Sequence, residues 1–527
     1  MFRRAPGIVV SAAERPQALQ GLQLGDPHDG AIVVWSRSDR AARMLVEWSY
    51  DETFKQSHRI VGPHALETTD FTVRQDIPGP ALSLSKGPAP SLSKGLEPGR
   101  DVFVRVTFQG LDNDRAISEP MAGRFVVPPP PLAAEGRTRG RADVRFMWSG
   151  DTAGQGFGIN PGFGGMKIYE AMRQRKPLFF IHSGDTIYAD SPIPSSLTVE
   201  DGKVWNNLVT PQVAKVAETL DEFRGRYRYN LMDENLRRFN AEVPQIWQWD
   251  DHDVMNNWSD SKDLSGDTRY TEKNVPLLIA RGGRAFREYA PMRPFDTRES
   301  QRIYRRFGYG PLLDVFVIDM RSYRGPNTAN LQTSPDTDTA FLGREQLEWL
   351  KSGLQRSRAV WKVVASDLPL GINVDDGKLP NGQARWEAVA NGEPGAPKGR
   401  ELELADLLGH LKRQRVRNVV WLTADVHYCA AHYYDPTKAA FRDFDGFWEF
   451  VSGPLNAGSF PPNTLDGTFG PQVMFVKGPP AGRLNLSPYS GFQFFGEVNI
   501  AAQSEEMTVD LRDIDGISVF SRTLQPR

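Results

Sequence analysis

FFIHSGDTIYAD, at residues 179–190, is an apolar run that ends abruptly in Gly184 and Asp185, and Tyr188 follows three residues after the aspartate. Earlier in the chain, VRFMWSGDTAGQG, at residues 144–156, ends a second apolar run in the same tripeptide, Ser-Gly-Asp. Short apolar runs rich in aromatic and β-branched residues are typical of buried β-strands, and the glycine allows a tight turn after each strand. The repeated tripeptide therefore predicts two strands that each place a carboxylate at their carboxyl end.

Similar runs follow at residues 244–249, 312–318, 360–365 and 418–423. Between them lie segments such as NLMDENLRRFNAE, at 230–242, and GREQLEWLKSGLQRS, at 343–357, whose leucines and aromatics recur at helical spacing. Strands that alternate with helices are typical of α/β domains built in layers. We therefore predict that residues 142–527 form one α/β domain.

The first part of the chain has a different pattern. Residues 15–127 contain short β-branched and aromatic runs separated by Gly, Pro and Asp, which predicts a small all-β domain of the immunoglobulin or fibronectin kind. A Ser-Leu-Ser-Lys-Gly repeat at residues 81–95 indicates an inserted surface loop. The four prolines within VVPPPPLAAEGRTRGR, at 126–141, favour an extended linker, which we place at residues 128–141.

Composition excludes several classes of protein. The chain has 63 basic and 65 acidic residues and a formal net charge of −2, so we expect no nucleic-acid partner. A single cysteine, Cys429, excludes an internal disulfide and a Cys-rich zinc site. No apolar run approaches the roughly 20 residues of a membrane span. The N-terminal residues include Arg3 and Arg4 but contain no complete signal peptide.

Five predicted strand ends carry possible metal ligands. Asp151 follows the first strand, Asp185 and Tyr188 follow the second, and WDDHDVMNNW (249–258), ASDLP (365–369) and ADVHY (424–428) follow three others. One aspartate after a strand is commonly a turn former or a helix cap, but five coincident clusters are harder to explain in that way. Ligands bind at the carboxyl ends of strands in open α/β sheets. Because carboxylates outnumber imidazoles, the set favours hard cations such as Ca²⁺, Mg²⁺, Mn²⁺ or Fe³⁺.

These motifs support a resemblance to a known family. GDTIY (184–188) resembles the GDxxY motif of purple acid phosphatases, which are binuclear metallophosphoesterases. WDDHDVMNNW, TADVHY (423–428), VIDMRSYRG (317–325) and FVSGPLNAG (450–458) look like segments of the PhoD-type alkaline phosphatase/phosphodiesterase family. The resemblance covers both predicted domains. It implies a layered β-sandwich flanked by helices, and metal-dependent hydrolysis of phosphate esters.

The resemblance also implies roles for individual residues. A first metal, which the resemblance suggests is Fe³⁺, would be bound by Asp151, Asp185, Tyr188 and His427. A second metal would be bound by Asp185, Asp251 and Asp425, and this all-oxygen set favours Ca²⁺, with Mn²⁺ or Zn²⁺ as alternatives. Asp185 would bridge the two ions, and His252 would act at the leaving group. Family members typically carry a metal-binding cysteine at the first motif, where this chain has Trp148-Ser149-Gly150-Asp151.

Two bridged cations would lower the pKa of a water between them, so that it can attack phosphorus. We expect His252 to protonate or position the leaving oxygen, and we name Asn256, Asn257 and Arg321 as candidates for phosphate contacts. Hydrolysis of phosphotriesters, a phospholipase D-like activity, and a non-catalytic phosphate- or lipid-headgroup-binding protein are the alternatives. The resemblance implies a periplasmic or secreted location. The sequence leaves open the preference among esters, the role of Asp367 and the oligomeric state.

Overall fold

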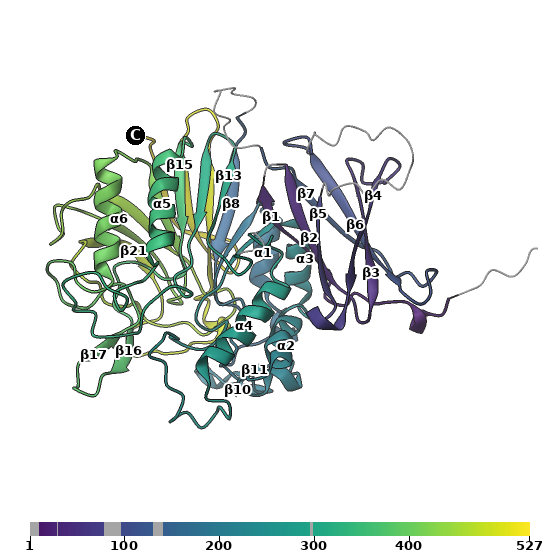
Figure 1. The fold of residues 1–527 in the computed structure, drawn as a ribbon, viewed down its shortest axis with the longest axis horizontal. Helices are drawn as coiled ribbons and strands as arrows, with labels where there is room; N and C mark the ends of the chain where they lie inside the picture. The colour runs from purple at the N-terminus through teal and green to yellow at the C-terminus, as the bar shows by residue number, and fades with distance from the viewer. Residues whose placement is uncertain (1–9, 29, 78–95, 130–140, 296–298) are drawn as a thin grey trace, which may run out of the picture.

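Two large β-sheets stack face to face, and helices cover both of their outer faces (Figure 1). The computed structural model describes residues 10–28, 30–77, 96–129, 141–295 and 299–527. The predicted α/β class, with a layered sandwich and an N-terminal β domain, is confirmed. The predicted surface loop at 81–95 and residues 130–140 of the predicted linker lie outside the described residues.

The first sheet has nine strands in the order β24-β23-β22-β8-β9-β12-β1-β2-β5. Its parallel centre consists of β8 (Val144–Ser149), β9 (Phe180–Ser183) and β12 (Gln245–Gln248). On one side lie the antiparallel strands β22 (Phe494–Ile500), β23 (Met507–Asp513) and β24 (Ser518–Leu524). On the other side lie β1 (Leu22–His28), β2 (Ala31–Arg37) and β5 (Thr72–Ile77).

The second sheet has seven strands in the order β13-β14-β15-β18-β20-β19-β21. Its parallel strands are β14 (Leu313–Val317), β15 (Trp361–Ala365), β18 (Val419–Thr423) and β20 (Phe447–Val451). Its antiparallel strands are β13 (Arg305–Tyr309), β19 (Cys429–Tyr434) and β21 (Pro471–Lys477). All six apolar runs that were predicted to be strands therefore lie in the two stacked sheets.

Four helices pack on the first sheet: α1 (Lys167–Gln174), α2 (Leu220–Asn230), α3 (Glu234–Glu242) and α4 (Val275–Tyr289). Two helices pack on the second: α5 (Arg344–Arg356) and α6 (Glu401–Arg413). The side chains of Thr219, Asp233 and Asn274 each accept a hydrogen bond from a first-turn amide, which fixes where α2, α3 and α4 begin. Helices α3 and α5 confirm the two helical segments predicted from leucine spacing.

Strand β8 illustrates how the layers pack. Phe146 and Trp148 enter the core between the two sheets, whereas Met147 enters the core between the first sheet and its helices. All three side chains have no exposed surface. A strand that is buried on both faces reads as a continuous apolar run, which is why its sequence is recognisable.

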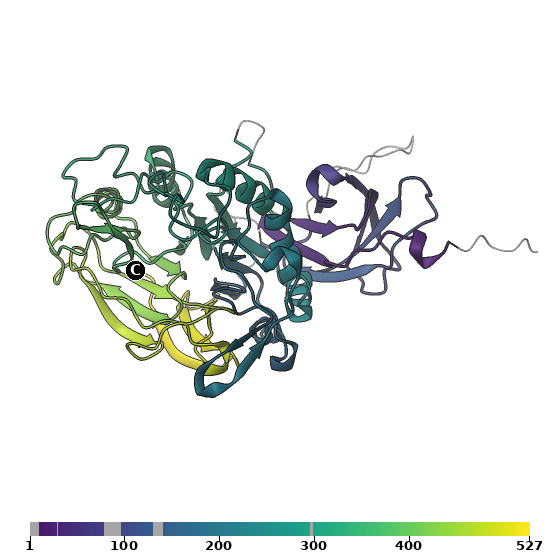
Figure 2. The same ribbon diagram turned by 90° about the horizontal axis from the view of Figure 1, so that it is seen from below.

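The N-terminal β domain stands beside the layered body (Figure 2). Its antiparallel sheet consists of β4 (His58–Ala65), β3 (Ala42–Ser49), β6 (Asp101–Gly110) and β7 (Met121–Val126). Its other strands, β1, β2 and β5, extend the nine-stranded sheet, because Gly25 of β1 pairs with Gln245 of β12. A Cβ at Gly25 would lie 2.1 Å from the Pro291 carbonyl oxygen, so this close approach requires glycine. The domain boundaries proposed from the sequence stay predictions.

Two short hairpins complete the strands: β10 (Ser196–Thr198) with β11 (Val204–Asn206), and β16 (Asp375–Lys378) with β17 (Ala384–Trp386). Within the described ranges, no helix has the length and apolar character needed to cross a bilayer.

Candidate metal centre

The loops that follow β8, β9, β12, β15 and β18 carry the side chains that the sequence singled out. The structure brings together the six residues that were predicted to bind metal, and all except the half-buried Asp425 are buried: Asp151, Asp185, Tyr188, Asp251, Asp425 and His427. They come from both stacked sheets, so the centre lies where the carboxyl ends of the two sets of parallel strands meet.

The backbone of these loops is unusual at the ligand positions. Asp151, Asp185 and Asp425 have positive φ values of 70°, 49° and 66°. Residues other than glycine, asparagine and aspartate rarely adopt this conformation, and strained backbone concentrates at functional sites. At Gly184 φ is 96°, and a Cβ there would lie 2.4 Å from the Asp250 Cβ. The glycine of the second Ser-Gly-Asp therefore allows two ligand loops to touch.

The four residues assigned to the first metal lie together. Ligand atoms of Asp151, Asp185 and His427 all lie within 4.8 Å of one another. The Tyr188 hydroxyl lies 2.7 Å from His427 Nε2 and 3.5 Å from Asp151 Oδ1. His427 Nδ1 hydrogen-bonds to the Gly458 carbonyl oxygen, which leaves Nε2 facing the centre. A second-layer bond of this kind orients a metal-binding histidine.

The second group contains a residue that the sequence interpretation missed. Asp250, Asp251 and Asp425 place carboxylate oxygens within 4.8 Å of one another, and Asp185 lies within the same distance of Asp251 and His252. Asp185 thus borders both groups, as a bridging ligand must. Asp250 stands in the quoted motif WDDHDVMNNW, but no ligand role was assigned to it there. The adjacent aspartates Asp250 and Asp251 were the sequence signal that could have identified it as a ligand.

The chemistry of this set fits hard cations. Asp151 Oδ2, Asp185 Oδ2 and Asp250 Oδ2 are buried and have no hydrogen-bond partner among the described residues. Burial, and then the surrounding carboxylates, raise the pKa of Asp151, Asp185 and Asp425 well above the usual range. Carboxylate charges of one sign are costly to bury together. Bound cations would offset these charges and would accept the lone pairs of the carboxylate oxygens that have no hydrogen-bond partner.

We expect the stabilising effect of bound metal to increase with pH. The folded, metal-free protein holds protons on Asp185 and Asp425 that the unfolded chain releases above about pH 4. The contribution of these two protonated carboxyl groups to the stability of the metal-free protein is therefore lost as pH rises through their raised pKa values. Bound cations replace those protons, so the difference in Tm between metal-loaded and chelator-treated protein should widen from about pH 5 to about pH 8. A constant difference, measured by thermal unfolding, would contradict this explanation.

His252 is held by a carboxylate that the sequence interpretation did not select. Its Nδ1 lies 2.7 Å from Asp190 Oδ1, and Asp190 Oδ2 accepts a hydrogen bond from the Asn256 amide at 2.9 Å. Burial lowers the pKa of His252, but Asp190 and Asp251 outweigh it and raise the pKa to about 9. Burial raises the pKa of Asp190, and His252 reverses that effect and holds it below the usual range. The pair fixes the ring and leaves Nε2 for the centre.

Asp253 clamps two of the ligand loops together. Its Oδ1 accepts hydrogen bonds from the Thr186 hydroxyl and, at 3.2 Å, from the Ile187 amide. Its Oδ2 accepts a hydrogen bond from the Asp250 amide at 3.0 Å. The loop after β9 is therefore tied to the loop after β12, which positions Asp185 against Asp251.

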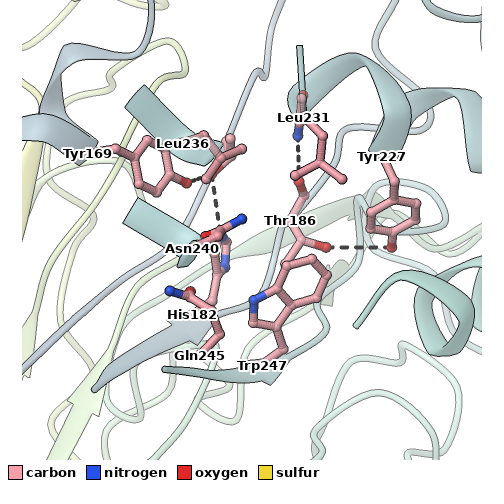
Figure 3. A pocket seen from close by; sticks show the side chains of 11 residues that line it. Tyr169, His182, Thr186, Tyr227, Leu231, Leu236, Asn240, Gln245 and Trp247 are labelled. Carbon is pink, nitrogen blue, oxygen red and sulfur yellow. Dashed lines mark hydrogen bonds between the residues drawn. The ribbon is translucent and has the colours of Figure 1, made fainter. Parts of the chain in front are cut away.

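A small cavity of about 20 Å³ lies behind these loops, on the side of the helices (Figure 3). Thr152, His182, Thr186 and Tyr227 are among its lining residues, and it is large enough for one water molecule. His182 Nε2 lies 3.2 Å from the Thr152 hydroxyl, and burial lowers the pKa of His182 to about 3, so its ring is neutral. His182 lies on β9, and its buried side chain packs on the side of the sheet that the helices cover.

The predicted substrate contacts lie close to the centre but have other partners. Arg321 is 1% exposed, and its guanidinium forms ion pairs with Asp250 and Glu387. It therefore supports the centre through its contact with Asp250. Asn257 donates its amide proton to Asp251 Oδ2 at 2.5 Å and its side chain to the Asp375 carbonyl oxygen at 3.3 Å. The Asn256 side chain is exposed. Contact of these three residues with substrate stays a prediction.

Asp367, whose role the sequence left open, faces the same buried arginine. Its Oδ2 lies 3.6 Å from Arg321 Nε, and burial together with Asp250 raises its pKa well above the usual range. Cys429 is buried on β19 between the two sheets and belongs to none of the candidate ligand groups among the described residues. The centre therefore consists of carboxylates, imidazoles and one phenol.

Comparison with known proteins decides the family. The family model of PhoD-like phosphatases matches residues 146–511, and the model of the N-terminal domain of PhoD-like phosphatases matches residues 4–83. The chain belongs to the PhoD-like phosphatase family. Within this family, alkaline phosphatase D of Bacillus subtilis (strain 168) is 28% identical over 311 residues, which cover 55% of this chain and 48% of that protein. The match thus spans about half the length of the curated relative.

Two solved structures share the fold of this PhoD-like chain. A structure of PhoD matches with a TM-score of 0.68 and 20% identity, and the match covers 98% of this chain and 90% of that chain. A purple acid phosphatase from yellow lupin (Lupinus luteus) seeds matches with a TM-score of 0.55 and 13% identity over 96% of this chain and 74% of that chain. At these identities the likeness concerns the fold.

Proposed function

We propose that this PhoD-like protein hydrolyses phosphate esters with the help of bound metal ions. The observation that carries the proposal is the position of Asp185, whose carboxylate lies within 4.8 Å of Asp151 and His427 in one group and of Asp251 and His252 in another. Cations bound there would polarise a phosphoryl oxygen and make an adjacent water acidic. Family membership and the curated relative support the same reaction class.

The donor atoms support different ions in the two groups. The group of Asp151, Asp185, Tyr188 and His427 contains a phenol and an imidazole, and we assign Fe³⁺ to it. The group of Asp185, Asp251 and Asp425 offers carboxylate oxygens, to which Asp250 adds another, and we assign Ca²⁺, with Mn²⁺ or Zn²⁺ as alternatives.

The chain's own residues supply positioning and proton transfer. Asp190 holds the His252 ring through Nδ1, and the His252 amide donates to Asp185 Oδ1 at 3.1 Å. Imidazole Nε2 is therefore held beside the bridging carboxylate, where it can protonate a leaving oxygen. Tyr188 stacks on the His252 ring with centroids 4.4 Å apart and restricts its rotation.

The alternatives share this centre. Phosphotriester hydrolysis and a phospholipase D-like reaction use the same phosphoryl chemistry, so the buried groups do not separate them. A phosphate- or lipid-headgroup-binding protein without catalysis needs no leaving-group acid, and the His252–Asp190 pair counts against it.

The test combines metal analysis with a substrate panel. Purified protein is assayed for metal content and for a visible absorption band, which Tyr188 bound to Fe³⁺ would produce. Activity is then measured on a phosphomonoester, a phosphodiester, a phosphotriester and phosphatidylcholine, before and after treatment with a chelator. We expect at least one ester to be hydrolysed, with activity lost on chelation and recovered on addition of metal. Metal-loaded protein that hydrolyses none of them would overturn the proposal.

A periplasmic or secreted location is proposed on the family resemblance alone. Fractionation of cells that express the full gene would test it, and the protein is expected in the periplasm or the medium.

A further inference from the structure

A groove lies at the opposite end of the seven-stranded sheet from the metal centre. It has a volume of about 390 Å³ and is lined by the residues that begin β15, β18 and β20: Trp361, Val419, Phe447 and Trp448. The candidate ligands Asp425 and His427 follow the other end of β18. Five residues of strand at about 3.3 Å each place the two sites about 16 Å apart. An occupant of the groove therefore touches none of the metal-site residues.

Aromatic side chains form part of the groove wall. Trp448 and Tyr433 both line it, are half-buried, and have ring centroids 5.2 Å apart. A Cβ at Gly446 would lie 2.3 Å from the Tyr433 hydroxyl, so glycine is what lets the phenol lie against this strand. Trp421 also lines the groove, and its buried indole N–H has no acceptor among the described residues. A buried donor without a partner calls for a ligand or a water.

Cations form another part of the wall. Arg417 and Arg522 are exposed lining residues, and the described part of the chain places no carboxylate within 4.0 Å of either guanidinium. The Arg522 guanidinium lies 5.0 Å from the centroid of the Trp448 ring. Lys412 lines the groove as well, although it pairs with Asp443 at 3.2 Å. Arginines that surface ion pairs do not engage remain available to a bound anion.

We propose that this groove binds a small molecule that combines a flat aromatic ring with an anionic group such as a phosphate, sulfonate or carboxylate. The ring stacks against Trp448 and Tyr433, and the anion takes charge-assisted hydrogen bonds from Arg417 and Arg522. The volume is that of a small-molecule site. The site is independent of the proposed hydrolysis, because it lies at the other end of the strands.

The test uses 1-naphthalenesulfonate as the probe. A sulfonate is not a phosphate ester, so the metal centre cannot turn it over. Isothermal titration calorimetry on the full chain compares it with 1-naphthol, which has the ring without a strong anion, and with inorganic sulfate. We expect the aromatic sulfonate to bind at least about tenfold more tightly than either fragment, since it makes both kinds of contact.

Variants place the binding in the groove. The double variant Arg417→Ala/Arg522→Ala should weaken sulfonate binding by about tenfold or more, and both side chains are exposed, so folding should be retained. Arg115→Ala, which removes an exposed arginine of the N-terminal domain, is the matched control and should leave affinity unchanged. Equal affinity in the double variant and the wild type, or no binding of the sulfonate, overturns the proposal. So does binding that is lost in Asp185→Ala and kept in the double variant, since the probe would then occupy the metal centre.

Discussion

Replacing Asp185 by alanine should remove metal from both candidate groups and lower kcat by at least about 1,000-fold. Asp185 belongs to the group with Asp151 and His427 and also lies within 4.8 Å of Asp251 in the second group, and its carboxylate is fully buried. A bound cation contributes several kcal/mol to the transition state, and each 1.36 kcal/mol corresponds to a factor of ten in rate. Metal content by elemental analysis and kcat on an aryl phosphate measure the effect.

The matched control for this substitution is Asp263→Ala. Asp263 is an exposed aspartate that binds Ser265 and stands outside the candidate ligand groups. We expect this control to keep its metals and its activity, whereas Asp185→Ala loses both and keeps its circular dichroism spectrum. An Asp185→Ala protein with two bound metals and unchanged kcat would show that the bridging assignment is wrong.

Replacing His252 by alanine should lower kcat by about 100- to 10,000-fold for esters with a poor leaving group. The loss should be much smaller for a 4-nitrophenyl ester, because 4-nitrophenolate leaves without being protonated. A dependence of this kind separates a leaving-group acid from a structural residue or a metal ligand, either of which would affect all esters alike. His64→Ala, at an exposed position of the N-terminal domain, is the control.

Asp190→Asn tests the same assignment through the partner of His252. The asparagine keeps the size of the side chain but removes the charge that holds Nδ1 at 2.7 Å. We expect kcat to fall by about tenfold to 100-fold with KM little changed, because the imidazole is still present but no longer oriented. If Asp190→Asn were as active as the wild type on every ester, the positioning role would be refuted.

Local sequence carries much of the fold because the central strands are buried on both faces. In a run such as 144–149 only Arg145 and Ser149 are polar, and a run of this kind is typical of an inner strand or a core helix. The N-terminal strands are harder to place. That β1 joins β12 depends on the contact of Gly25 with residues more than 200 positions away, and no local pattern records it.

The two copies of Ser-Gly-Asp show where the sequence is sufficient. Each copy ends a parallel strand, and the carboxyl ends of parallel strands meet at one edge, so strand position alone predicts that Asp151 and Asp185 lie together. Asp425 and His427 follow β18 of the other sheet, so strand position predicts that they lie at a strand end, and the packing of the two sheets brings them to the centre. Position relative to a strand end is a local property, and a glycine followed by aspartate marks it plainly.

Only the tertiary structure decided how the acidic side chains divide their tasks. Four residues in or near the recognisable motifs have roles that the motifs do not reveal. Asp190 orients His252, and Asp250 joins the candidate ligands. Asp253 ties two ligand loops together, and Arg321 forms an ion pair with Asp250. These roles depend on which atoms face one another across two sheets, between residues that lie up to 175 positions apart along the chain, as Asp250 and Asp425 do. The sequence by itself determined which strands end in ligands. The packing of one sheet on the other determined which of those carboxylates face the centre and which hold it in place.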